Sequence, residues 1–130
     1  MNLIVCIANN NGIMFNKRRV SKDALLIERL REITKNNKLY ISEYSKEIFN
    51  DFENIIQDIS LLENEDYYFL EDENLPYFNF NKIIIYKWNR DYPADKFFDL
   101  NLSEYNKIKE EEFVGNSHEK ITEIIYTKEK

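Results

Sequence analysis

Hydrophobic and polar positions divide the chain into two kinds of segment. Three runs are apolar without polar alternation: LIVCIA at 3–8, YYFL at 67–70 and KIIIYKW at 82–88. Such runs are typical of strands that are covered on both faces. Other segments carry their apolar residues at helical spacing instead. The pattern therefore predicts strands that alternate with helices.

The clearest helical stripe follows the first strand. Leu26 and Leu30 lie at helical spacing within DALLIERLREIT, which predicts a helix with one face toward the core. Ser21 is the predicted N-cap, and Asp23 would lie in the first turn, where a carboxylate favours the helix N-terminus. The segment between strand and helix, NNNGIMFNKRR (9–19), is rich in polar residues and predicts a loop.

The middle of the chain predicts shorter elements. A short strand is expected at LYIS (39–42), and Ile48, Phe49 and Phe52 form a second helical stripe that Ser42 would cap. Three further segments follow: a short helix DISLLENE (58–65), a weak helix or turn ENLPYFNF (73–80) broken by Pro76, and an irregular excursion NRDYPADKFFDLNLSEY (89–105).

The end of the chain predicts an antiparallel hairpin. Two extended stretches, YNKIKEEEF (105–113) and EKITEIIYTK (119–128), are joined by VGNSH, whose Gly115 and Asn116 suit a tight turn. With 130 residues, the chain fits one domain spanning 1–130. The expected architecture is a single-domain α/β fold in which helices flank a mixed sheet that ends in this hairpin.

Charge and composition narrow the classes of function. The protein is acidic, with a net charge of −6, and its one basic cluster is Lys17, Arg18 and Arg19. This balance disfavours nucleic acid and anionic membranes as partners. The single cysteine, Cys6, is expected to be a core thiol. Without a membrane-length apolar run or an N-terminal signal pattern, the expected location is the cytoplasm.

Metal chemistry has few candidate ligands. One His and one Cys do not make a zinc site of the usual types. Glu71 and Asp72, with Asp66 and Glu73, form an acidic cluster at the end of a strand, where they are weak candidates for a divalent metal. A solvated carboxylate run is the simpler interpretation. His118 is interpreted as a turn residue without a catalytic triad.

Several joints between these elements resemble those of dihydrofolate reductase. The family's motifs include NNGIG after the first strand, MGRKT after a later strand, IGG, GDTFFP and an NSH-like turn in the tail hairpin. The counterparts here are NNNGIM (9–14), REIT (31–34), ISEYS (41–45), FLED (69–72), ADKFFDLNLSEY (94–105) and EEFVGNSHEKITEIIY (111–126). The resemblance implies a shortened dihydrofolate reductase-like fold, because the stretch between the second helical stripe and YYFL has no room for the family's middle strand pair.

The same resemblance implies that the reductase chemistry is lost. The family's acid, which helps protonate the pterin, falls on Leu26, and Asp23 is a weak substitute. The Arg that contacts the cofactor's added phosphate falls on Glu43, and the paired glycines beside the pyrophosphate fall on Glu71 and Asp72. Acidic side chains at these places would repel the phosphates. No cofactor is therefore expected.

The chain is also similar to a set of small bacterial proteins from Firmicutes that share FNKRR-type, WNRDYPAD and GNSHEKIT segments. Some of these carry the name ribonuclease Z in genomes. Enzymes of that name use several clustered His and Asp ligands, which a single His does not supply. A metal-dependent nuclease or hydrolase is therefore a weakly supported alternative.

The favoured function is a pseudoenzyme, a binding or regulatory module whose ligand or protein partner is unknown. Its surface would be the former cleft, formed by the 9–20 loop, the 41–45 joint and the 70–73 turn. Candidate binding residues are Lys17, Arg18, Arg19, Trp88, Arg90 and Tyr92, because exposed aromatic and Arg side chains dominate binding hot spots. An active NADPH-dependent pteridine or folate reductase with an altered site remains the main alternative. A free sheet edge is also compatible with a homodimer.

Overall fold

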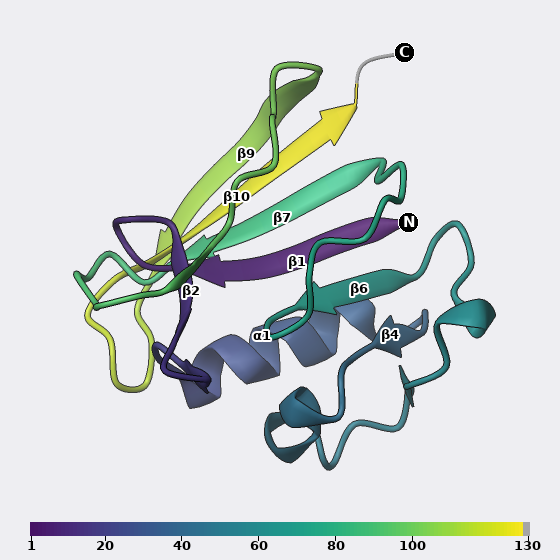
Figure 1. The fold of residues 1–130 in the computed structure, drawn as a ribbon, viewed down its shortest axis with the longest axis horizontal. Coiled ribbons are helices and arrows are strands. Elements are labelled where there is room, and N and C mark those ends of the chain that lie inside the picture. The colour runs from purple at the N-terminus through teal and green to yellow at the C-terminus, as the bar shows by residue number, and fades with distance from the viewer. Residues whose placement is uncertain (129–130) are drawn as a thin grey trace.

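The computed structural model describes residues 1–128, which form a mixed sheet beside one α-helix (Figure 1). Strand β1 (Asn2–Ile7) lies at the centre, parallel to β6 (Tyr67–Leu70) on one side and to β7 (Lys82–Lys87) on the other. The full order is β5-β4-β6-β1-β7-β10-β9. The outer strands are β4 (Leu39–Tyr40), β5 (Ile55–Ile56), β9 (Tyr105–Phe113) and β10 (Ile121–Lys128).

The predicted mixed sheet and its closing hairpin are confirmed. Strands β9 and β10 pair antiparallel, and β10 also pairs antiparallel with β7, while β4, β5 and β6 are parallel. The three apolar runs form β1, β6 and β7, whose central residues are buried because the sheet is covered on both faces.

Helix α1 (Ala24–Thr34) covers one face of the sheet with Leu26 and Leu30, which pack against Ile4 of β1. Its N-cap is Asp23, whose carboxylate accepts hydrogen bonds from the backbone N–H groups of Leu25 and Leu26. The prediction of Ser21 as N-cap is therefore wrong. The helix begins two residues later than expected, and Asp23 caps it instead of lying in its first turn.

The other face is covered by segments that are mostly irregular and by a second, three-stranded sheet, β3-β2-β8. Strands β2 (Gly12–Phe15) and β3 (Arg18–Arg19) form a hairpin inside the predicted loop 9–19, so that prediction is wrong in part. The hairpin turn places Asn16 and Lys17 at φ 53° and 65°, and two-residue hairpin turns require such positive angles. Strand β8 (Lys96–Phe97) pairs with β2.

The predicted second helix is also wrong. The segment forms only a 3-10 turn, η1 (Tyr44–Ile48), and DISLLENE contributes a second one, η2 (Ile59–Leu61). Phe49 and Phe52 reach the core from an irregular turn, with Phe49 in edge-on contact with Phe69 at 4.9 Å between ring centroids. Their helix-like spacing therefore comes from packing. No helix in the part of the chain that the structure describes is long and apolar enough to cross a membrane.

Candidate functional site

The first candidate site is the former cleft, at the edge where parallel strands β4, β1 and β6 end. Glu71 follows β6 directly and is almost completely buried. Arg19 from β3 holds it side-on: Nε donates to Oε2 at 2.8 Å and Nη2 donates to Oε1 at 3.2 Å. Ser45 Oγ donates to the same Oε1 at 2.7 Å. A bidentate ion pair therefore occupies the cleft.

Further contacts keep Arg19 in this place. Its Nη1 donates to Glu47 at 2.6 Å, and its guanidinium lies over the Tyr44 ring at 4.5 Å from the centroid. Burial would lower the pKa of Arg19, but hydrogen bonds to Glu71 and Glu47 raise it above the ordinary value. Beside the pair remains a cavity of about 20 Å³, lined by Cys6, Ile27 and Trp88 among others. This volume holds about one water molecule.

The other acidic residues at this edge accept hydrogen bonds from different hydroxyl groups. Ser42 Oγ donates to Asp72 at 2.6 Å. Tyr40 and Tyr68 both donate to Glu73, and burial together with Glu73 raises the pKa of Tyr40 to about 12.

Two further carboxylates complete the predicted set. Asp66 accepts the backbone N–H groups of Lys38 and Glu63, and Glu43 is exposed and accepts from Gln57. Within residues 1–128, no group of three or more His, Cys, Asp or Glu side chains has an arrangement that would hold a metal ion. The weak metal candidates Glu71 and Asp72 therefore have hydroxyl and guanidinium partners instead.

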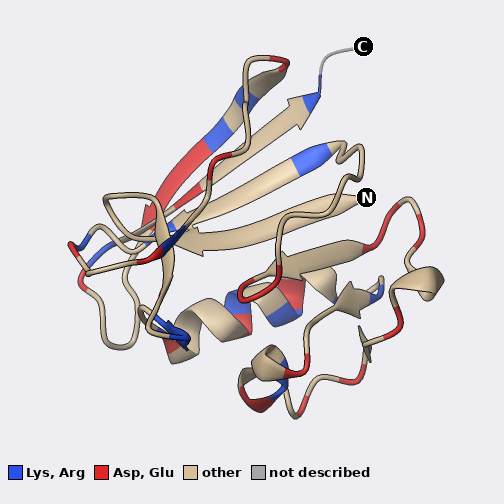
Figure 2. Cartoon of the chain, in the orientation of Figure 1, with Lys and Arg blue, Asp and Glu red and all other residues tan. Residues whose placement is uncertain are grey.

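The basic cluster is divided between the core and the surface. Lys17 and Arg18 are exposed at the β2–β3 hairpin, whereas the side chain of Arg19 is directed inward to Glu71. In Figure 2 these basic residues colour the ribbon of this hairpin blue. Phe15, next to the turn, is 44% exposed. The hairpin thus presents an aromatic ring and two cations to solvent.

The second candidate site is centred on Asp23 at the start of α1. Besides capping the helix, its carboxylate accepts the backbone N–H groups of Asn116 at 2.9 Å and Ser117 at 2.8 Å. Gly115 permits this approach, because a Cβ there would lie 2.5 Å from Asp23 Oδ2. Burial would raise the pKa of Asp23, but the N–H donors of Asn116 and Ser117 and the His118 ring hold it well below its usual range.

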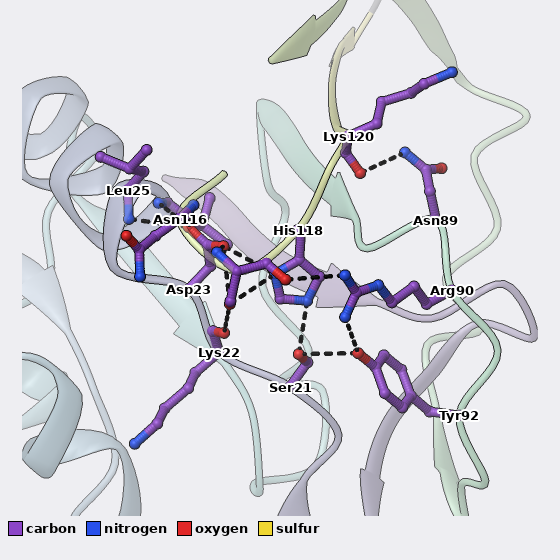
Figure 3. Close-up of polar contacts among 12 residues, drawn as sticks. Ser21, Lys22, Asp23, Leu25, Asn89, Arg90, Tyr92, Asn116, His118 and Lys120 are labelled. Atoms are coloured by element: carbon purple, nitrogen blue, oxygen red, sulfur yellow. Dashed lines mark hydrogen bonds and ion pairs between the residues drawn. The ribbon is translucent and has the colours of Figure 1, made fainter. Parts of the chain in front are cut away.

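His118 connects this carboxylate to two hydroxyl groups (Figure 3). Its Nδ1 lies 2.9 Å from Asp23 Oδ2, and its Nε2 lies 2.8 Å from Ser21 Oγ. Tyr92 donates its hydroxyl to Ser21 Oγ at 3.2 Å. The His118 ring is buried and stacks on Trp88 with 4.7 Å between ring centroids. The arrangement has the connectivity of a Ser-His-Asp triad.

The structure brings some predicted residues together and separates others. Trp88, Arg90 and Tyr92 surround His118 and Ser21, with Arg90 Nη2 donating to the carbonyl of Ser117 at 2.9 Å. Lys17 and Arg18 lie on the hairpin instead. His118 does lie in the turn at 115–118, as predicted. The expectation that nothing places an acid and a hydroxyl group around it is wrong, because Asp23 and Ser21 both contact its ring. No local signal in the sequence links it to Asp23, which is 95 positions away.

Comparisons with known proteins support the fold alone. No protein-family model matches the chain, and no curated protein sequence matches it. Among solved structures, 214 chains match. One is dihydrofolate reductase from Enterococcus faecalis in complex with NADP(H) and RAB-propyl, with a TM-score of 0.69 and 10% identity. The match covers 99% of this chain and 96% of that one. The protein has a dihydrofolate reductase-like fold.

Proposed function

We propose that this protein keeps the dihydrofolate reductase-like fold without the reductase activity, and that it acts as a binding module through the rim of the former cleft. The observation that carries the proposal is the buried ion pair between Arg19 and Glu71, which leaves a cavity of only about 20 Å³. A cofactor or folate would have to displace that pair. Breaking a buried pair by removing one partner typically costs 3–5 kcal/mol.

The acidic edge supports the loss of cofactor binding. By resemblance, Glu43, Glu71 and Asp72 occupy the positions from which the family contacts the cofactor's phosphates. Glu71 is paired with Arg19, whereas Glu43 and Asp72 accept hydrogen bonds from the uncharged side chains of Gln57 and Ser42. Two like charges 4 Å apart repel by about 4 kcal/mol at the dielectric of a protein surface, so Glu43 and Asp72 would repel a phosphate. Ser42 and Ser45, on either side of Glu43, contact Asp72 and Glu71, so these positions lie at one edge. The residues present do not fit a dinucleotide.

The position of the catalytic acid supports the same conclusion. Leu26, at the matching place, is 1% exposed and packs in the core. Asp23 has both carboxylate oxygens in use by the cap, the 115–118 turn and His118. A carboxylate that accepts this many hydrogen bonds stays ionised and is a poor proton donor.

The rim provides the binding surface. Phe15, Lys17 and Arg18 combine an exposed aromatic ring with two cations on a protein of net charge −6. Aromatic and Arg side chains are enriched at interface hot spots, and the two cations favour an acidic protein segment as partner.

A thermal-shift titration with NADPH and with folate analogues tests the loss of reductase function. A true ligand at a hundredfold excess over its dissociation constant would stabilise the fold by about 2.7 kcal/mol. We expect no shift with either compound, with an active dihydrofolate reductase as the positive control. Saturable stabilisation by NADPH would support the active-reductase alternative and contradict the proposal.

Affinity purification from native extract tests the rim. The double variant Lys17→Glu/Arg18→Glu reverses two charges on the hairpin. Lys35→Glu is the control at the exposed end of α1, where Lys35 pairs with Glu32. Partners retained by the wild type and by the control, but lost by the double variant, are expected. Equal recovery with all three proteins would exclude the hairpin as the binding surface.

A further inference from the structure

We propose that Ser21, His118 and Asp23 form a nucleophilic site that accepts a small acyl group from an activated carboxylic ester. The basis is a continuous chain of hydrogen bonds: Ser21 Oγ to His118 Nε2 at 2.8 Å, and His118 Nδ1 to Asp23 Oδ2 at 2.9 Å. A nucleophile within reach of a base that is oriented by a third group is the signature of covalent catalysis. The site shares the small cavity of the former cleft, which Ser21 lines together with Arg19 and Glu71.

Asp23 is a positioning residue in this arrangement. As a carboxylate that only accepts, it takes the hydrogen of His118 Nδ1, which leaves the Nε2 lone pair directed at Ser21 in the neutral ring. The backbone N–H groups of Asn116 and Ser117 fix the carboxylate from the other side. Stacking on Trp88 fixes the plane of the imidazole. The base therefore has one tautomer and one orientation.

Two donors lie beside Ser21 and are available to an oxyanion that forms once the acyl group is bound. Tyr92 presents its hydroxyl 3.2 Å from Ser21 Oγ, and Arg90 Nη1 lies 3.5 Å from that hydroxyl oxygen, which favours hydrogen-bond donation by the phenol. The backbone N–H of Lys22, the residue after the nucleophile, has no acceptor within residues 1–128. In many acyl-transfer enzymes the N–H of the residue after the nucleophile serves the oxyanion.

The cavity next to Ser21 sets the size of the acyl group. Ser21 and Lys22 line the same cavity of about 20 Å³ as Ile27 and Trp88. That volume accepts a group of about the size of one water molecule, and its side walls are mostly apolar. The methyl group of an acetyl ester is about this size, whereas the alkyl chain of a hexanoyl ester is too long for the cavity. The substrate class is therefore short-chain activated esters.

The reaction balances with water as the second substrate. Ser21 Oγ forms a bond to the acyl carbon while its proton passes to His118 Nε2. The bond from that carbon to the leaving oxygen then breaks, and the proton leaves with the alcohol or phenol. Water attacks the acetyl-Ser21 ester, gives its proton to Nε2, and releases acetate as Ser21 recovers its proton.

A purely structural role explains only part of the geometry. Anchoring the 115–118 turn to α1 requires Asp23 and its N–H donors. It does not require the hydrogen bond between the Ser21 hydroxyl and His118 Nε2, or the one that Tyr92 donates to Ser21. Ser21 is also partly exposed, whereas His118 and Asp23 are buried, as expected for an accessible nucleophile with a protected base.

The test uses the full-length protein with p-nitrophenyl acetate and with a fluorophosphonate probe. Intact-mass spectrometry is expected to show one covalent adduct, mapped to Ser21. Ser21→Ala should abolish it, and His118→Gln should slow it by about 10²-fold or more, as for removal of a general base. Tyr92→Phe should slow acylation by about 10- to 100-fold through loss of one oxyanion donor. p-Nitrophenyl acetate should react faster than p-nitrophenyl hexanoate, because the cavity beside Ser21 is small.

Ser103→Ala is the matched control, because Ser103 is exposed and lies outside the network of Ser21, His118 and Asp23. It should retain the wild-type acylation rate within about twofold, since general-base catalysis runs through Nε2. Circular dichroism confirms that each variant is folded, and Ser21→Ala is the decisive one because its hydroxyl lies outside the helix cap. Absence of an adduct on the wild type, or an adduct that persists in Ser21→Ala, would overturn the proposal.

Discussion

Two buried carboxylates of this protein are neutralised in different ways. Glu71 in the cleft and Asp23 at the start of α1 are 6% and 3% exposed. Glu71 is held by a guanidinium that takes both its oxygens, so the charge is cancelled and the cleft is filled. Asp23 is held by N–H groups and an imidazole. Because an imidazole has a second nitrogen, the effect of Asp23 extends to Ser21.

Burial alone does not determine whether a carboxylate fills a site or orients the groups around it. The group that hydrogen-bonds to the carboxylate determines which of the two occurs. A guanidinium has no acceptor to pass on a proton, whereas a neutral histidine has one. The cleft therefore resembles a reductase site in fold only. At the second site, the turn at 115–118 packs against the start of α1 and brings His118 into contact with Asp23 and Ser21.

The largest expected effect is that of Asp23→Ala. The change leaves the N-terminus of α1 uncapped and several buried N–H groups without an acceptor. We expect a loss of about 4 kcal/mol in the free energy of unfolding, measured by urea denaturation. Asp58→Ala is the control, since Asp58 caps the 3-10 turn η2 from an exposed position and should cost less than about 1 kcal/mol. Similar losses in both variants would contradict the clamp described for Asp23.

The next effect tests the ion pair as a unit. Glu71→Ala leaves Arg19 buried without its main partner and should cost about 3 kcal/mol. The double change Arg19→Met/Glu71→Leu removes both charges, and we expect it to recover most of that loss, because apolar replacement of a buried pair is often neutral. A double variant as unstable as Glu71→Ala would show that the cleft depends on the charges themselves.

A third buried carboxylate, that of Glu123, makes the stability of the protein depend on pH. Glu123 accepts hydrogen bonds from Arg29 and Tyr86 and pairs with Lys109 at 2.9 Å. Burial would raise its pKa, but these partners lower it from 4.5 to about 2. A lowered folded-state pKa gives stability that is present above pH 4.5 and lost as the pH falls toward 2.

The measurement is urea denaturation across this pH range. Glu123→Gln should lack roughly 3 kcal/mol of the acid-dependent loss that the wild type shows between pH 4.5 and 2. Wild type and variant with the same slope would mean that Glu123 does not hold its partners as described. Asp23→Asn should likewise reduce the loss in the free energy of unfolding as the pH falls below about 4, because the pKa of Asp23 is also lowered.

The smallest expected effect concerns Gly115. Its φ is not positive, so the cost of Gly115→Ala comes from the contact between the new Cβ and Asp23. We expect a loss of about 1–2 kcal/mol in the wild-type background. In the Asp23→Ala background the loss should be smaller, because the clashing carboxylate is gone. Equal losses in both backgrounds would place the strain elsewhere, such as on Ile121.

Local sequence patterns predicted the elements in which burial follows a regular pattern along the chain. Strands β1, β6 and β7 and helix α1 were found because continuous apolar runs and a single helical stripe report burial directly. The helix proposed around Phe49 and Phe52 was wrong, because side chains from an irregular turn reached the core at the same spacing. The β2–β3 hairpin was missed because its strands are short and its turn has no glycine.

The candidate sites were also predicted only in part, since the sequence indicated their residues but not the contacts between them. The resemblance directed attention to Glu71 and Asp72, and both do lie at the strand edge, but their partners were not predictable. Glu71 meets Arg19 across 52 positions of chain. Nothing in the spacing of either residue indicates that contact. The predicted aromatic and Arg residues Trp88, Arg90 and Tyr92 do come together, although around a histidine that the sequence placed in a plain turn.

By itself, the sequence determined the α/β class, the central strands, the closing hairpin and the first helix, because each depends on hydrophobic periodicity within one segment. The tertiary structure alone decided which carboxylate meets which partner. Ser21 and His118 lie 97 positions apart and touch only because the turn after β9 packs on the start of α1. Contacts between distant segments depend on how the whole sheet is assembled, and no local pattern records them.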